Sequence, residues 1–325
     1  MNKFDLVKRN TQEIINEDEL KNLMKKKKYS AYIGFAPTGR MHIGYLIPLT
    51  KIADFINAGF EFKFLIADMH AFLDDKKTPW EKLDLRAKYY EDTIKAVFKS
   101  IGVDTSKIEF VKGSDFQLSK EYMLDVLHLS GELTMNRCKR AASEVVRFNE
   151  EPKLGGFIYP ILQILDPVYM NVDVSLGGID QRGIYMMGRE VLPKLKNRSL
   201  TCVFTPLLPG LTGDKMSASN ESSKIDLLDS EQEVITKLKK AYCPEGIVEG
   251  NGVLAFIEHV IFPIKNKFLI ERAEKFGGNI EYSSYKQLEK DFVAKKMHPM
   301  DLKNQLAKEL NLILAPVRKT MEKKN

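Results

Sequence analysis

The stretch A-Y-I-G-F-A-P-T-G-R-M-H-I-G-Y-L, residues 31–46, decides how the fold of this chain is interpreted. Its apolar first part is typical of a buried strand, which Pro37-Thr38-Gly39 then interrupts. After Gly44 apolar residues recur with the spacing of a helix. A strand, a glycine-bearing turn and a helix start favour phosphate binding, because the first N–H groups of a helix are unpaired and lie at the positive end of its dipole.

Two well-known phosphate motifs do not match this stretch. Gly34 and Gly39 have the spacing of a P-loop, but Arg40-Met41 stands where Lys-Ser/Thr would follow. The glycine fingerprint of dinucleotide-binding folds is absent from the stretch as well. Taken alone, the stretch therefore indicates an ordinary strand–turn–helix connection. Whether it binds a nucleotide has to be inferred together with motifs elsewhere in the chain.

Polar residues follow two further predicted strands. Asp68 and His70 come directly after the apolar run 62–67, where they indicate either a ligand site or a helix cap made by Asp68. The alternating run 172–176 ends at a glycine pair, and Asp180 follows it. A carboxylate just beyond a strand and its glycines is well placed to accept hydrogen bonds from ribose hydroxyls.

Tyr159, Gln163 and Asp166 share one face of a predicted helix, because they are spaced four and three residues apart. They lie in an otherwise apolar segment, and burying polar groups costs free energy unless each finds a partner. The trio therefore predicts either a pocket for a polar ligand or an internally satisfied hydrogen-bond network.

Residues 209–219 read P-G-L-T-G-D-K-M-S-A-S and predict a loop. Lys215 would supply a compact charge suited to a triphosphate, and Ser217 a hydroxyl donor. Loops that contain lysine and serine are common, so this segment alone is weak evidence for a phosphate site.

The composition is that of an ordinary globular protein. Of 325 residues 44% are hydrophobic and 29% charged, and the formal net charge of +6 permits a nucleic-acid partner without requiring one. Three scattered cysteines form no C-x-x-C pair, so we expect neither a disulfide framework nor a zinc site. We also expect no signal peptide and no membrane span, and hence a cytoplasmic protein.

Joined in order, these blocks resemble the paired signatures of class I aminoacyl-tRNA synthetases. P-T-G-R-M-H-I-G-Y at 37–45 is followed by K-M-S-A-S at 215–219. Y-I-G-F-A-P-T-G, Y-P-I-L-Q-I-L-D and G-G-I-D-Q-R overlap the first signature or lie between the two, and A-Y-C-P-E-G and H-P-M-D-L-K follow at 241–246 and 298–303. Over nearly the whole chain the combination resembles tyrosyl-tRNA synthetases of the archaeal and eukaryotic cytosolic type.

The resemblance implies an α/β fold in which a doubly wound, Rossmann-like parallel-sheet catalytic domain precedes an all-helical anticodon-binding domain. We place a helical lead-in at residues 1–30, the catalytic domain at 31–225 and the anticodon-binding domain at 226–325. The residues after 226 favour helices on their own account, because their apolar positions recur at helical spacing without a convincing run of strands.

The activity that the resemblance implies is ATP-dependent attachment of L-tyrosine to tRNA(Tyr) through a tyrosyl-adenylate. ATP would enter as its Mg²⁺ complex, no protein-bound metal is expected, and family members are homodimers. Catalysis would rest on positioning and on charge stabilisation at the phosphates rather than on a protein nucleophile.

Residue by residue, the resemblance assigns four groups. The catalytic group that holds the triphosphate and pyrophosphate comprises Thr38, His42, Lys215 and Ser217. Adenine and ribose would contact Gly44, Gly178 and Asp180. Tyrosine would be bound by Tyr32, Tyr159, Gln163, Asp166 and Gln181, with Tyr32 and Asp166 on the phenol. The tRNA would be contacted by Arg140 at the acceptor stem and by His298 and Asp301 at the anticodon.

Two positions depart from the family pattern: Tyr45 replaces a histidine, and Ala218 replaces a lysine that many members carry. An aromatic residue that accompanies the anticodon base is expected near 260–262. Three alternatives remain at this stage: a tryptophanyl-tRNA synthetase, a nucleotidyltransferase that does not act on tRNA, and an RNA-binding protein without catalysis. Tyr32 with Asp166 favours a phenol over an indole.

Overall fold

The computed structural model describes residues 2–213 and 224–324. The chain divides into two compact units, each assembled from three segments. Unit 1 comprises Met1–Gly39, Lys51–Asp92 and Asp104–Pro206, and unit 2 comprises Arg40–Thr50, Thr93–Val103 and Leu207–Asn325. The domain boundaries expected at residues 30 and 225 stay predictions, because the two units alternate along the chain.

Unit 1 contains a six-stranded sheet with the order β1-β6-β5-β2-β3-β4. Its strands are β1 (Glu13–Ile15), β2 (Ser30–Phe35), β3 (Glu61–Ile66), β4 (Ile108–Lys112), β5 (Val174–Gly178) and β6 (Thr201–Thr205). Strands β2 to β6 are parallel, and β2 is central: β3 and β4 follow on one side of it, β5 and β6 on the other. The predicted doubly wound α/β architecture is therefore confirmed for this part of the chain.

The edge strand β1 corrects two details of the prediction. It pairs antiparallel with β6, so the sheet is mixed rather than purely parallel. It also lies within residues 1–30, where we expected only helix. Three residues are too short to show an alternating pattern, and the β-branched pair Ile14-Ile15 gains its strand conformation from pairing with β6.

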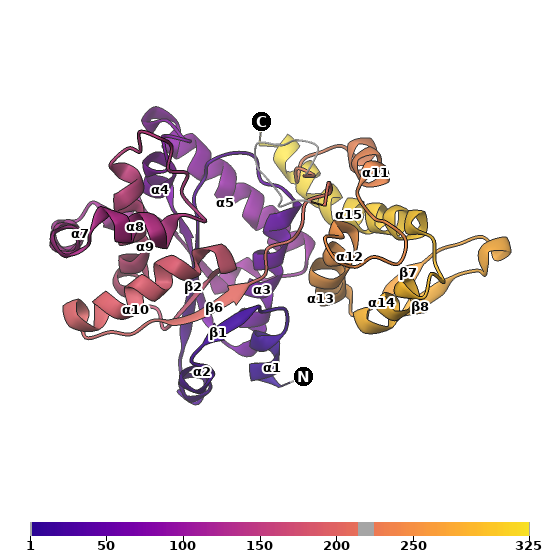
Figure 1. Cartoon of the computed structure of the whole chain (residues 1–325), viewed down its shortest axis with the longest axis horizontal. Coiled ribbons are helices and arrows are strands. Elements are labelled where there is room, and N and C mark those ends of the chain that lie inside the picture. The colour runs from indigo at the N-terminus through magenta and orange to yellow at the C-terminus, as the bar shows by residue number, and fades with distance from the viewer. Residues whose placement is uncertain (1, 214–223, 325) are drawn as a thin grey trace. The chain divides into compact units, whose positions relative to one another are not determined.

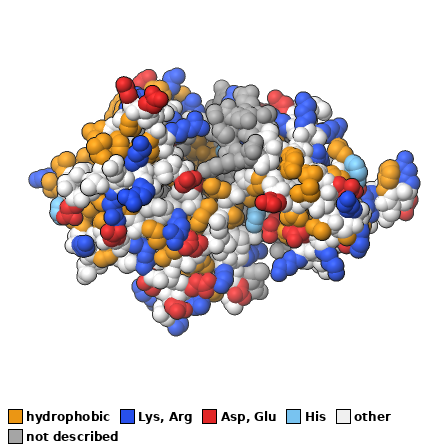
Figure 2. All heavy atoms as spheres, in the orientation of Figure 1, with side chains coloured by type: hydrophobic (Ala, Val, Ile, Leu, Met, Phe, Trp, Pro, Cys, Tyr) orange, Lys and Arg blue, Asp and Glu red, His pale blue; other side chains and the backbone are white. Residues whose placement is uncertain are grey.

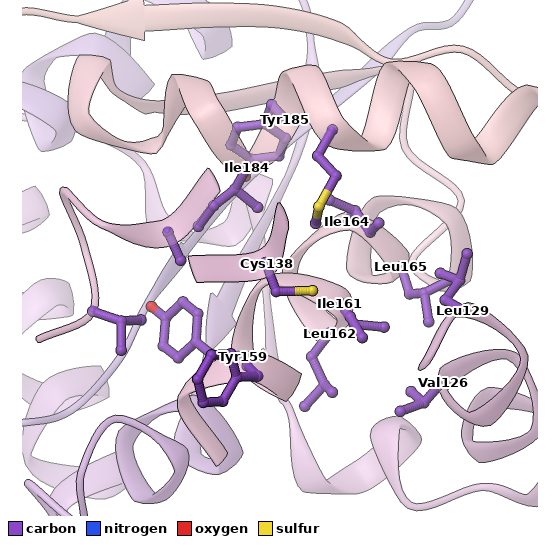
Figure 3. Close-up of a cluster of buried hydrophobic side chains, with 14 of the residues drawn as sticks. Val126, Leu129, Cys138, Tyr159, Ile161, Leu162, Ile164, Leu165, Ile184 and Tyr185 are labelled. Atoms are coloured by element: carbon purple, nitrogen blue, oxygen red, sulfur yellow. The ribbon is translucent and has the colours of Figure 1, made fainter. Parts of the chain in front are cut away.

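Helices connect and cover these strands (Figure 1). They are α1 (Lys3–Lys8), α2 (Glu17–Leu23), α3 (Leu46–Ala58), α4 (Asp68–Leu73), α5 (Leu83–Ser100), α6 (Ser114–Gln117), α7 (Lys120–Glu132), α8 (Met135–Ala142), α9 (Gly155–Tyr169) and α10 (Arg182–Lys196). Helix α9 is central among them, because it packs against α4, α7, α8 and α10. Figure 3 shows the apolar cluster around α9, to which α7, α8 and α10 also contribute side chains.

Unit 2 is built mainly from helices after residue 230. These are α11 (Glu231–Lys240), α12 (Gly252–Phe256), α13 (Phe262–Lys265), α14 (Tyr285–Val293) and α15 (Pro299–Glu322). The leucines at 302, 306, 310 and 314 form a fully buried stripe on α15, as their helical spacing predicted. The prediction of an all-helical domain is wrong in one respect: β7 (Phe268–Ile270) and β8 (Ile280–Tyr282) form an antiparallel two-stranded sheet.

Within the described residues, no helix combines the length and apolar character that a membrane span requires.

Candidate active site

A small cavity of about 20 Å³ lies in unit 1. It brings together all five residues that the resemblance assigned to the amino acid: Tyr32, Tyr159, Gln163, Asp166 and Gln181. Strand β2 supplies the first of them, α9 the next three, and the 3-10 turn Ile179–Gln181 after β5 the last. Strands β2 and β5 are neighbours from which the chain winds in opposite directions, and open α/β sheets bind ligands at such a switch point.

One carboxylate oxygen of Asp166 faces this cavity, and the other accepts hydrogen bonds from neighbouring side chains. Its Oδ1 accepts hydrogen bonds from Gln117 Nε2 at 2.7 Å and from the Tyr122 hydroxyl at 2.8 Å. Its Oδ2 lies 3.6 Å from Nε2 of His70. Burial raises the pKa of the Asp166 carboxyl group to about 7, against the opposing effect of the two hydrogen bonds. The residue can therefore change its charge near neutral pH.

His70 forms part of the wall beside Asp166. Burial lowers the pKa of its imidazole to about 3, so the ring is neutral at physiological pH. The ring meets Tyr159 edge to face with 4.6 Å between centroids. Neither ring nitrogen has a hydrogen-bond partner among the described residues. Buried nitrogens of this kind are uncommon and indicate a polar partner that binds from the cavity.

Tyr32 also lines the cavity and is almost fully buried. Its hydroxyl is 2.8 Å from that of Tyr185 and donates a long hydrogen bond of 3.4 Å to the carbonyl of Gln163. Burial raises the pKa of Tyr32 well above its ordinary value, so the hydroxyl keeps its proton and remains a donor.

Two glutamines lie at another part of the cavity. Gln163 Nε2 donates to Gln181 Oε1 at 2.9 Å, whereas Gln163 Oε1 has no partner within the described chain. The alternative of an internally satisfied network therefore holds for part of the trio only. An unpartnered amide oxygen can accept a hydrogen bond from an ammonium group.

Three residues that contact this constellation were not predicted: Gln117, Tyr122 and Tyr185. Gln117 follows the exit of β4, so the rule that singled out Asp68 and His70 after β3 would have found it. Tyr122 and Tyr185 carry no such signal, because only the packing of α7 and α10 brings them to the cavity. Asp68 itself is a structural residue, since its Oδ1 accepts from the backbone N–H groups of Met69 and Ser114.

The first signature forms the predicted turn and helix start. The turn at 37–39 follows β2, and His42 precedes a 3-10 turn, Ile43–Tyr45, that leads into α3. His42 Nδ1 accepts from the N–H of Gly44 at 3.2 Å, which places the ring hydrogen on Nε2. Burial, with the nearby charge of Lys224, lowers the pKa of His42 to about 4. His42 is thus a neutral donor at physiological pH.

Of the other residues predicted to contact the nucleotide, the structure describes Gly178 and Asp180 but not Lys215 and Ser217. Gly178 is the last residue of β5, and Asp180 lies in the following 3-10 turn, as a ribose site at the end of a strand requires. Lys215 and Ser217, and with them Ala218, lie outside the described residues. Within the described ranges, no group of three or more histidine, cysteine or carboxylate side chains could hold a metal ion.

The predicted tRNA-contacting residues are accessible. Arg140 is exposed near the end of α8. His298 is exposed at the N-cap of α15, where its Nδ1 accepts from the N–H of Met300 at 3.1 Å, and Asp301 lies in the first turn. The aromatic residue in the expected range 260–262 is Phe262, which is half-buried and packs against Phe268 and Tyr285, so its contact with the anticodon stays a prediction.

A family model and named relatives agree on the class of protein that this chain resembles. The family model described as tRNA synthetases class I (W and Y) matches residues 24–315. The cytoplasmic tyrosine–tRNA ligase of Danio rerio is 50% identical over 98% of this chain and 60% of its own length. The tyrosine–tRNA ligase of Haloarcula marismortui is 48% identical over 99% of this chain and 94% of its own length. This chain therefore spans about 60% of the vertebrate relative and nearly all of the archaeal one.

Solved structures agree with these relatives. The tyrosyl-tRNA synthetase of Archaeoglobus fulgidus, crystallised with L-tyrosine, superimposes with a TM-score of 0.92 and is 42% identical over 98% of both chains. A tryptophanyl-tRNA synthetase from Aeropyrum pernix reaches a TM-score of 0.72 at 19% identity, covering 94% of this chain and 82% of its own. The second similarity shows a common fold and nothing finer.

Proposed function

The chain belongs to the class I tyrosyl-tRNA synthetases of the archaeal and eukaryotic cytosolic type, and from this premise we propose that it attaches L-tyrosine to tRNA(Tyr) at the expense of ATP. In the first step the tyrosine carboxylate attacks the α-phosphate of ATP, which gives tyrosyl-adenylate and releases pyrophosphate. In the second step the terminal adenosine of the tRNA takes the tyrosyl group and AMP leaves. ATP enters as its Mg²⁺ complex.

The observation that carries this proposal is the free oxygen of Asp166 in a buried cavity. The substrate phenol donates its proton to Oδ2, and the Tyr32 hydroxyl donates to the phenol oxygen. Tyr159, Gln163 and Gln181 bind the amino and carboxylate groups. As is known for tyrosyl-tRNA synthetases, such a site rejects phenylalanine, because the analogue without the hydroxyl leaves the buried polar groups unpaired. An indole ring offers no hydroxyl for this pair.

The nucleotide is held by the two signatures and the end of β5. Thr38 and His42 bind the triphosphate, and His42 does so as a neutral Nε2–H donor. Gly44 admits the adenine ring to the helix start, while Gly178 and Asp180 bind the ribose. Lys215 and Ser217 complete the phosphate contacts from the second signature. The charge that develops on the phosphates is stabilised by these fixed donors.

The tRNA contacts are divided between the units. Arg140 of unit 1 contacts the acceptor stem, and His298 and Asp301 of unit 2 contact the anticodon. For the anticodon aromatic we now propose Phe276, whose side chain is 64% exposed. It follows β7 in the loop that Arg272 ties to the carbonyl of Lys296, two residues before His298.

A second copy of the chain is the partner that we propose for the outer face of α7. This face exposes Met123, Leu124 and Leu127, and Leu118 and Met135 extend the apolar surface beyond both ends of the helix. Figure 2 shows hydrophobic side chains among charged ones at the side of the molecule where Figure 1 labels α7. Contiguous exposed apolar side chains commonly mark interfaces, and family members are homodimers.

Aminoacylation of total tRNA with each amino acid in turn tests the proposed function. We expect tyrosine alone to be attached, and we expect pyrophosphate exchange into ATP to require tyrosine. Attachment of tryptophan would favour the tryptophanyl alternative. A folded protein that charges no tRNA but binds it would be a binding protein, and nucleotidyl transfer without an amino acid would identify a nucleotidyltransferase.

A further inference from the structure

The turn between α4 and α5 has an unfavourable backbone. Asp75 and Lys76 are consecutive residues with positive φ angles of 52° and 55°. Residues with a Cβ atom rarely adopt this left-handed region, and two in succession are rarer still. Backbone strain of this kind persists only where the surroundings hold it, and it concentrates at functional sites.

Side chains from residues 149–153, which lie far away in the sequence, hold this turn through hydrogen bonds. The Asp75 carboxylate accepts from Lys153 Nζ at 2.6 Å and from Asn149 Nδ2 at 3.3 Å. At the end of the turn, the N–H of Thr78 donates to the carbonyl of Ala71 in α4 at 3.1 Å. The turn therefore places Thr78 at a fixed position.

Thr78 is fully buried and reaches the first signature. Its hydroxyl donates to the carbonyl of Pro37 at 2.6 Å. Two residues later in the signature, the N–H of Gly39 donates to the hydroxyl of Tyr90 on α5 at 3.4 Å. Both neighbours of Thr38 are thus held by side chains from outside the signature.

We propose that Thr78 is a positioning residue for adenylate formation: the strained turn holds its hydroxyl against Pro37 and thereby fixes Thr38 for the triphosphate. This inference rests on the proposed function and assigns Thr78 no contact with substrate. A phosphate-binding loop acts through donors that are already in place before the transition state forms. Without the hydroxyl, the Pro37 carbonyl loses its partner in a buried position, and the loop gains freedom.

The test compares Thr78→Val with Thr78→Ser in tyrosine-dependent pyrophosphate exchange. Valine keeps the shape and removes the hydroxyl, whereas serine keeps the hydroxyl. We expect Thr78→Val to lower kcat/KM for ATP about tenfold, because the transition state loses a pre-set contact. The dissociation constant for tyrosine, measured by equilibrium dialysis without ATP, should stay within about twofold of wild type, and Thr78→Ser should restore most of the activity.

Thr50→Val is the matched control, because Thr50 is also a buried threonine, but its hydroxyl donates to Ile47 in the same helix at 2.8 Å. It should leave the ATP kinetics unchanged. If Thr78→Val does not fold, Asp75→Ala is the second variant, since it releases the turn from Lys153 at a partly exposed site and should shift ATP kinetics in the same direction.

Three outcomes would overturn the inference. They are wild-type ATP kinetics in a folded Thr78→Val protein, an equal loss in Thr78→Ser, and tyrosine affinity that falls as much as kcat/KM for ATP. The wild-type assay separates these from a failure of the proposed function: absence of tyrosine-dependent exchange in the unmodified protein would refute the function itself.

Discussion

Asp166 is an aspartate whose surroundings disfavour its charge. Burial raises the pKa of its carboxyl group from 3.8 to about 7, while Gln117 and Tyr122 donate to one oxygen and oppose the shift. In the pH range between these two values the folded state binds more protons than the unfolded state. Stability therefore falls as the pH rises from about 4 to about 7, and the loss persists above that range.

Replacing Asp166 with asparagine should remove this pH dependence. At pH 4.5 the wild-type carboxyl group is largely protonated when folded, so Asp166→Asn should have nearly wild-type stability. At pH 8 the variant should be more stable than wild type without substrate, by an amount on the order of 3 kcal/mol, because it buries no charge. Urea unfolding of both proteins at the two pH values measures the difference.

Asp18→Asn is the control for this comparison, since the Asp18 side chain is 94% exposed. It should show no such difference between the two pH values. An Asp166→Asn protein whose stability relative to wild type is the same at both pH values would show that the carboxyl group of Asp166 titrates normally.

At the scale of elements, a buried lysine fastens α1 to α3. Lys51 is 1% exposed, and its Nζ donates to the carbonyl of Leu6 at 2.9 Å, to the carbonyl of Arg9 and to Asp54 at 3.2 Å. Burial lowers the pKa of Lys51 to about 8, so the lysine is still largely charged at neutral pH. This ammonium group thus ties the N-terminal segment to α3 through three acceptors, beside the ion pair between Arg9 and Asp54.

Lys51→Met should release α1 and lower stability by about 2–4 kcal/mol, because it leaves two buried carbonyls without their partner and removes one of the two cations at Asp54, the other being Arg9. Hydrogen–deuterium exchange should rise in residues 3–9 more than in β2 or β3. Lys25→Met, at an exposed lysine, is the control. Uniformly faster exchange throughout unit 1 would mean that Lys51 supports the whole core and not this helix alone.

The elements also show where sequence patterns suffice. Strands β2, β3 and β5 were predicted from the sequence, because each has an apolar or alternating run of five residues or more. Strands β1, β7 and β8 have three residues each, too few for a periodic signal, and their conformation comes from pairing. Of the five residues assigned to tyrosine, Tyr159, Gln163 and Asp166 were singled out by their helical spacing in an apolar segment, and Tyr32 and Gln181 were assigned through the family resemblance. Tyr122 and Tyr185 were missed because tertiary packing alone brings them to the cavity.

At the scale of the whole molecule, the amino-acid cavity belongs to unit 1 and the proposed anticodon contacts belong to unit 2. Each unit has its own buried core, so a surface change in one need not disturb the other. This division predicts that tRNA recognition can be impaired without loss of adenylate formation.

Phe276 gives the sharpest test of that division. Its ring is 64% exposed, it precedes Gly277 with a φ of 94°, and the Lys275 ammonium lies 5.0 Å from the ring centroid. An exposed ring beside a cation suits the stacking of a base, which contributes roughly 1–3 kcal/mol when measured by alanine substitution. Phe276→Ala should therefore lower kcat/KM for tRNA about tenfold or more. Tyrosine-dependent pyrophosphate exchange should stay at the wild-type rate.

Two controls make the Phe276 prediction specific. Phe276→Tyr retains an aromatic face and should charge tRNA nearly as well as wild type. Leu312→Ala removes another exposed apolar side chain, 56% exposed on α15, and should have little effect. If Phe276→Ala charged tRNA normally, the ring would not stack on the anticodon. If exchange and charging fell together, unit 2 would support the chemistry as well as recognition, and the division of roles between the units would be wrong.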